Sequence, residues 1–218
     1  MSSNNFENKK YRDAVLEGIK IMCRVFWGPD LEFCRQMRGK VFFRPFEIAL
    51  SEQDERVPVI LSDMNSIING FETSQSLSDC LNEWYVRLFV NNKEGIIPLY
   101  QSCYEFENAP MMGASAVKMV NRFESKGLSV GNAVHEPPDH LAIELEYLFF
   151  LLQEKNTGPS DDTDTSAPSE AALFASETLL PWAIVFNQRL ELVTGRGRFY
   201  FLYAQMLVQL LGLIISRG

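Results

Sequence analysis

The sequence lacks most of the patterns that mark an enzyme or a metal protein. It contains two histidines, His135 and His140, and four cysteines, with no CxxC motif and no Cys/His pair at metal-ligand spacing. A Gly-rich phosphate loop, a GxSxG nucleophile motif and an HExxH zinc motif are also missing. We therefore predict a protein that is not an enzyme and that carries no cofactor.

The few cysteines and the polar N-terminus favour a cytoplasmic protein. The cysteines are widely separated along the chain: Cys23, Cys34, Cys80 and Cys103. We expect them to be reduced thiols that lie mostly in the core, as is usual in the cytosol. The N-terminal stretch MSSNNFENKKYRDA has no apolar segment of the kind that a secretory signal needs.

Basic residues are in the minority. The chain has 20 Lys and Arg against 28 Asp and Glu, which gives a net charge of −8 and a pI of about 4.9. Sequence-independent nucleic-acid binding needs clustered Lys and Arg, so we expect no nucleic-acid partner. An acidic surface would steer a basic peptide toward the protein, although solubility alone also explains this charge.

One long run without charge, residues 199–215, approaches the lower length limit of a membrane helix. However, polar or small residues recur along it at helical spacing: Gln205, Gln209, Gly212 and Ser216. That stripe is typical of a terminal helix packed on a soluble bundle. We expect no stable membrane insertion.

Helical periodicity dominates the rest of the chain. Apolar residues recur at helical spacing over residues 8–26, 31–37, 57–72, about 77–89, 110–127, 139–152 and 171–193. Ser76 or Ser78 is the expected N-cap of the fourth of these helices, and Gly127 the expected end of the fifth. Pro181 predicts a kink or a break into two helices.

Strand signals are short, so we predict an all-α fold, a single compact bundle of about eight or nine helices. It is expected to contain two subdomains, residues 1–135 and 136–218. Residues 155–169 consist of Gly, Pro, Ser, Thr, Asp and similar residues without an aromatic, and are expected to form a flexible linker. A mobile hinge leaves both a monomer and a domain-swapped dimer open.

The segment at residues 136–152, EPPDHLAIELEYLFFLL, is the predicted centre of the fold. Pro137 and Pro138 favour an extended or turn approach to a helix, and Asp139 can accept hydrogen bonds from first-turn amides. The following residues are apolar on nearly every side, which is typical of a helix in the middle of a packed domain.

This segment carries a resemblance to a known family. EPPDHLAIELEYL resembles the E-P-x-D-H-x-x-x-E-L-E-F/Y-M/L signature of the TorD/DmsD family of cytoplasmic redox-enzyme maturation chaperones. Two further blocks agree in order and spacing: WYVRLFV…PLYQSCY at residues 84–104, and LLPW at residues 179–182 followed by RFYFLYAQML. Two positions depart from the family pattern, since Asn91 replaces its Gly and Thr178 its His.

The resemblance implies a TorD-like fold and a chaperone function. Such a protein binds the twin-arginine signal peptide of a molybdopterin oxidoreductase catalytic subunit and assists its maturation before export. The implied peptide-binding positions, together with Glu144 as a candidate from helical spacing, are Trp84, Tyr85, Leu88, Phe89, Pro98, Tyr100, Pro138, Asp139, His140 and Glu144. Glu146 is a further candidate for the leader arginines.

Other interpretations stay open from the residues alone. His140 is most simply a first-turn residue that hydrogen-bonds a neighbouring helix, whereas the resemblance places it at a ligand-facing turn. Glu144 shares its helical face and would orient the imidazole. The aromatic stripe at residues 84–89 is ordinarily core. The alternative functions are a nucleotide-binding protein and a helical scaffold for a different amphipathic segment.

Overall fold

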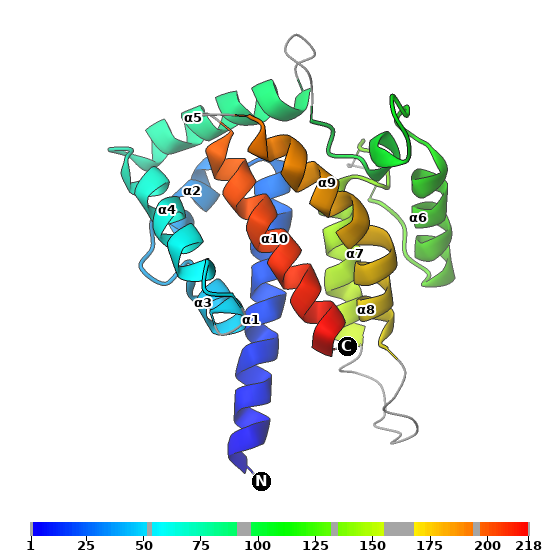
Figure 1. Ribbon diagram of the computed structural model, residues 1–218, viewed down its shortest axis with the longest axis horizontal. Coiled ribbons are helices and arrows are strands. Elements are labelled where there is room, and N and C mark those ends of the chain that lie inside the picture. The colour runs from blue at the N-terminus through cyan, green and yellow to red at the C-terminus, as the bar shows by residue number, and fades with distance from the viewer. Residues whose placement is uncertain are drawn as a thin grey trace.

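The computed structural model describes residues 2–51, 54–90, 97–131, 135–154, 168–193 and 197–217, with side chains from residue 9 onward. Helix α1 (Ser2–Trp27) is central to the molecule (Figure 1). Three helices pack against it: α3 (Arg44–Leu50), α7 (Leu141–Glu154) and α10 (Arg198–Arg217). Gly28 ends α1 with a φ of 97°, a conformation that glycine adopts without strain. Asp30 then caps α2 (Leu31–Met37) by accepting a hydrogen bond from the Phe33 amide at 2.6 Å.

Helices α3 (Arg44–Leu50), α4 (Val57–Asn69) and α5 (Ser74–Tyr85) lie on one side of the bundle, and a π-helical turn, η1 (Val86–Val90), continues α5 (Figure 1). Helix α3 packs on α1, α4 packs on α10 and α3, and α5 packs on α2. Pro45 and Pro58 stand in first turns, where a missing N–H costs no helical bond. The predicted cap of α5 is wrong. Thr73 is the N-cap, and Ser76 is its partner in a capping box.

On the opposite side lie the short 3-10 helix η2 (Gln101–Tyr104), α6 (Ala114–Ser125) and α7 (Leu141–Glu154) (Figure 1). Helix α6 starts four residues later than the predicted 110–127, and Gly127 ends it as expected, with a φ of 66°. The Leu128 amide donates to the Phe123 carbonyl at 2.8 Å, which closes this C-terminal turn.

The last third of the chain forms two long rods. Helices α8 (Glu170–Phe174) and α9 (Leu180–Glu191) join through a π-helical turn, η3 (Ala175–Leu179), so Pro181 is accommodated by a wider turn rather than a break. Helix α10 (Arg198–Arg217) crosses α9 and α1. It is the one helix among the described residues long and apolar enough to cross a membrane, and 61% of its most apolar window is buried in the protein.

The all-α prediction is confirmed. The structure is 74% helical, with nine helices when α8, η3 and α9 are taken as one rod, and no strand occurs among the described residues. The four cysteines are free, as expected. The division into two subdomains stays a prediction, while Asn91 and residues 155–167 of the expected linker lie outside the described residues.

Candidate functional site

Two of the family-like blocks meet in space at the turn before α7. The Gln101 amide donates to the Asp139 carbonyl at 3.0 Å, and the Leu141 amide donates to the Leu99 carbonyl at 2.8 Å. These bonds form an isolated antiparallel bridge between Tyr100 and His140. The segment at residues 97–104 is therefore held against the start of α7.

The Asp139 side chain fastens the same segment. Its Oδ2 accepts a hydrogen bond from the Ser102 amide at 2.8 Å, and the residue is fully buried. The expectation that Asp139 caps the first turn of α7 is wrong, because this long-range contact takes the carboxylate instead. Asp139 has no exposed surface in this structure.

His140 is the N-cap of α7. Its Nδ1 accepts a hydrogen bond from the Ala142 amide at 3.2 Å, and only 2% of the residue is exposed. Burial lowers the pKa of His140 to about 4, against the opposing influence of Glu136 and Asp139. The ring stacks on Trp27, with centroids 4.9 Å apart, and meets the edge of Tyr100 at 5.3 Å. His140 is therefore neutral near pH 7.

Glu144 lies deeper in the fold and does not orient His140. It is fully buried, and its Oε2 accepts a hydrogen bond from Trp182 Nε1 at 3.0 Å. Burial raises the pKa of this carboxyl well above its usual range, although the Trp182 bond acts in the opposite direction. Through Trp182 on α9, the third family-like block joins the other two.

The remaining predicted positions differ in their surroundings and in how deeply they are buried. Tyr85 lies close to the turn: its hydroxyl donates to the Phe26 carbonyl at 3.1 Å, and burial and Glu136 raise its pKa to about 12. Leu88 and Phe89 belong to the core, and the half-buried Trp84 packs on Phe71. The two prolines at candidate positions, Pro98 and Pro138, are half-buried.

Two exposed glutamates border the buried turn, and we call this pair the acidic edge. Glu136 accepts a hydrogen bond from the Tyr100 hydroxyl at 2.7 Å, and Glu146 accepts one from Trp27 Nε1 at 2.7 Å. Among the described residues, no Lys or Arg forms an ion pair with either carboxylate. The acidic edge is therefore anchored by aromatic donors and open to a cation.

An apolar groove of about 250 Å³ adjoins the acidic edge, between the end of α1 and helices α6 and α7. Its walls include Trp27, Phe123, Ile143, Tyr147 and Phe150, and Glu146 stands among them. Trp27 thus belongs both to the groove and to the surroundings of His140, and its indole N–H holds Glu146 at the groove. The groove therefore offers a mainly apolar surface with one carboxylate, that of Glu146, in its lining.

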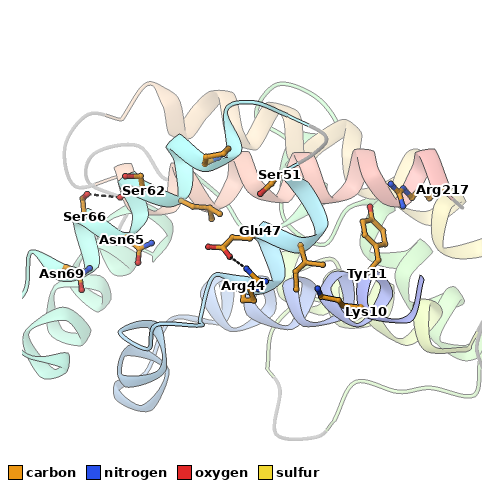
Figure 2. A pocket seen from close by; sticks show the side chains of 13 residues that line it. Lys10, Tyr11, Arg44, Glu47, Ser51, Ser62, Asn65, Ser66, Asn69 and Arg217 are labelled. Atoms are coloured by element: carbon orange, nitrogen blue, oxygen red, sulfur yellow. Dashed lines mark hydrogen bonds and ion pairs between the residues drawn. The ribbon is translucent and has the colours of Figure 1, made fainter. Parts of the chain in front are cut away.

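A second, larger cavity of about 1150 Å³ lies between α1, α3, α4 and the end of α10 (Figure 2). It is lined mainly by polar side chains, with an Arg44–Glu47 ion pair and the Arg217 guanidinium 4.1 Å from the Tyr11 ring centroid. It contains no residue of the turn before α7 or of the three family-like blocks. Its polar lining makes it a poorer match for an apolar peptide than the groove at α7.

Comparison with known proteins assigns the chain to a family. The sequence model of the family described as nitrate reductase delta subunit matches residues 53–188. A chaperone protein TorD of Vibrio vulnificus is 31% identical over 147 residues, which is 67% of each chain. A chaperone protein TorD of Vibrio parahaemolyticus is 24% identical and covers 84% of this chain and 88% of its own.

A crystal structure of a redox enzyme maturation protein from Archaeoglobus fulgidus shares the fold. It has a TM-score of 0.52 and 19% identity, with 90% of this chain and 93% of that chain covered. The TorD relatives are named as chaperones and place this chain among chaperones rather than enzymes, while the Archaeoglobus structure shows the shared fold. The chain belongs to the nitrate reductase delta subunit family, within its TorD group.

The groove and the acidic edge were not found by sequence reasoning, apart from Glu146. Glu136 stands in the EPPDH motif, but nothing in its sequence context distinguishes it from an ordinary surface glutamate. Trp27 is separated from Glu146 by 119 positions. Only the packing of α1 on α7 brings them together.

Proposed function

We propose that this chaperone binds the twin-arginine leader of a molybdopterin oxidoreductase catalytic subunit in the cytoplasm. By holding the leader, it keeps the enzyme from export until its cofactor is in place. The family resemblance supplies this hypothesis. A chlorate reductase assembly chaperone protein of Ideonella dechloratans, 31% identical over 93 residues, supports it at the level of the client class.

The single observation that carries the proposal is the junction of an apolar groove with the exposed carboxylates of Glu136 and Glu146 beside the family-like turn. A twin-arginine leader combines two guanidinium groups with an apolar stretch. Carboxylates bind guanidinium through paired, charge-assisted hydrogen bonds. Burial of apolar area contributes about 25 cal/mol per Å² before the costs of association.

Calorimetric titration with a synthetic twin-arginine leader tests the proposal. We expect saturable binding that weakens with added salt, because charge interactions are screened over about 10 Å at 0.1 M ionic strength. Binding should persist at high salt, since the apolar contribution is not screened. A scrambled peptide of the same composition is the control. Equal affinity for the leader and its scrambled form would rule the proposal out.

A further inference from the structure

The carboxylates beside His140 differ in what they can offer a ligand. Asp139 and Glu144 are fully buried, and each already accepts a hydrogen bond from a protein N–H group. Glu136 and Glu146 are exposed, and each uses one lone pair on an aromatic donor. An ionised carboxylate has about four lone-pair sites, so both keep capacity for a guanidinium fork.

The two aromatic residues that hold the acidic edge both contact the imidazole of His140. Trp27, which holds Glu146, stacks on His140 with an interplanar angle of 15°, and Tyr100, which holds Glu136, meets the same ring edge-on. Aromatic faces next to a carboxylate also attract a guanidinium through cation–π interaction. Because Glu146 also lines the groove, a chain bound at the acidic edge continues directly into apolar surroundings.

We propose that the two leader arginines bind Glu136 and Glu146, that the apolar residues after them occupy the groove, and that Asp139 positions the site without touching the peptide. This inference rests on the proposed function. The choice of occupant follows from charge complementarity, since a basic pair followed by an apolar stretch matches an acidic edge followed by a groove. Asp139 acts through the Ser102 amide, which it holds against the turn.

Glutamine variants of Glu136 and Glu146 test the contribution of charge to leader binding without a change in side-chain shape. Glu136→Gln and Glu146→Gln keep an oxygen that can accept the Tyr100 or Trp27 hydrogen bond and remove only the negative charge. We expect each to weaken binding of the leader by about tenfold, the usual worth of one charge-assisted contact. A leader with both arginines replaced by glutamine should bind the parent and the two variants equally. Glu55→Gln is the matched control for net charge, because Glu55 is an exposed carboxylate on the turn before α4.

Asp139 requires a conservative pair of variants. Asp139→Asn retains an acceptor for the Ser102 amide, so affinity for the leader should stay within about twofold of the parent. Asp139→Ala removes the acceptor and should weaken binding of both leaders to the same degree, because it loosens the site rather than an arginine contact. Circular dichroism and thermal melting establish that each variant is folded. The arginine-to-glutamine leader, titrated against the parent, tests the charge contribution without any variant.

The outcomes distinguish this inference from the proposed function. If the parent does not bind the leader, the proposed function fails and the inference fails with it. If the parent binds while Glu136→Gln and Glu146→Gln match Glu55→Gln, the leader is bound elsewhere and the inference alone is overturned. If Asp139→Asn loses affinity for the arginine leader but not for its glutamine form, Asp139 contacts an arginine directly, and its positioning role is wrong.

Discussion

At the residue scale, the turn before α7 is unusual because three ionisable side chains are buried within six positions. Asp139, His140 and Glu144 are each at most 2% exposed. Burying a polar group without a partner is costly, and each side chain has one hydrogen-bond partner: the Ser102 amide, the Ala142 amide and the Trp182 indole. The second carboxylate oxygens, Asp139 Oδ1 and Glu144 Oε1, have no partner among the described residues. Ser102 belongs to η2, Ala142 to α7 and Trp182 to α9, so these hydrogen bonds fix how the three helices meet.

The buried His140 makes stability depend on pH. Its pKa in the folded protein is about 4, below the ordinary 6.5, so the unfolded chain takes up the proton first as pH falls. Its contribution to stability is therefore present above about pH 6.5 and is lost as pH falls toward 4. Between pH 7 and 5 we expect the loss from this group to be about 2 kcal/mol.

Urea unfolding of the parent and of His140→Asn at both pH values measures this effect. Asparagine is a good N-cap and keeps an acceptor for the Ala142 amide, but it does not titrate. The variant should lose about 2 kcal/mol less than the parent between pH 7 and 5. The carboxylates are the same in both proteins, so most of their contribution cancels in the difference. Identical pH dependence would show that His140 is not held neutral by burial.

At the element scale, helices could be predicted from the sequence more reliably than their caps. Apolar periodicity identifies α1, α4, α5 and α7 because it reports the face that each helix buries. The N-cap predictions for α5 and α7 fail for different reasons. At α5, four hydroxyl residues stand close together, and the local sequence pattern does not show which of them is the N-cap. At α7, the carboxylate of Asp139 binds an amide from a distant segment, which leaves capping to His140.

The capping box of α5 gives a second test. Thr73 Oγ1 accepts from the Ser76 amide at 3.0 Å, and the Thr73 amide donates to Ser76 Oγ at 3.2 Å. Thr73→Ala should lower the free energy of unfolding by about 1 kcal/mol, while Thr73→Ser should retain most of it. Chemical denaturation measures both, with Ser78→Ala as a comparison for the cap predicted from sequence. Ser78 is buried, but alanine is close to serine in size, so we expect the packing there to tolerate the substitution. On that basis, a larger loss of stability in Ser78→Ala than in Thr73→Ala would contradict the assignment of Thr73 as the N-cap.

At the scale of the whole molecule, the site arises from helices that are far apart in sequence. The motif residues of the three family-like blocks were predicted from resemblance, and the structure brings Tyr100, Asp139, His140 and Glu144 into one region. The groove depends on how α1, α6 and α7 pack, and sequence periodicity says which face is buried but not which helix covers it. No sequence pattern therefore indicated that Trp27 and Phe123 would line one groove beside the turn at His140.

The packing of α1 and α10 provides the last prediction, because one glycine in each helix is in the opposite situation: Gly18 faces the neighbouring side chains and Gly212 faces open space. A Cβ on Gly18 would lie 3.3 Å from Leu210 Cδ1 and 3.4 Å from Phe46 Cε1, both of them fully buried side chains. A Cβ on Gly212 in α10 would meet nothing within 4 Å. Alanine is favoured over glycine inside a helix by about 1 kcal/mol, whereas overpacking a core costs about 1–3 kcal/mol.

Gly212→Ala should therefore raise the free energy of unfolding by up to about 1 kcal/mol, and Gly18→Ala should lower it by about 1 kcal/mol. The close approach is tested further by combining Gly18→Ala with Leu210→Ala. Leu210→Ala alone should cost about 3 kcal/mol, but it frees the space that the new methyl group needs. In that background Gly18→Ala should be neutral or stabilising, a coupling that distant sites do not show. Equal stabilisation by Gly18→Ala and Gly212→Ala in the parent would mean that α1 and α10 do not pack this closely, and that α10 is less firmly held in the bundle than its burial implies.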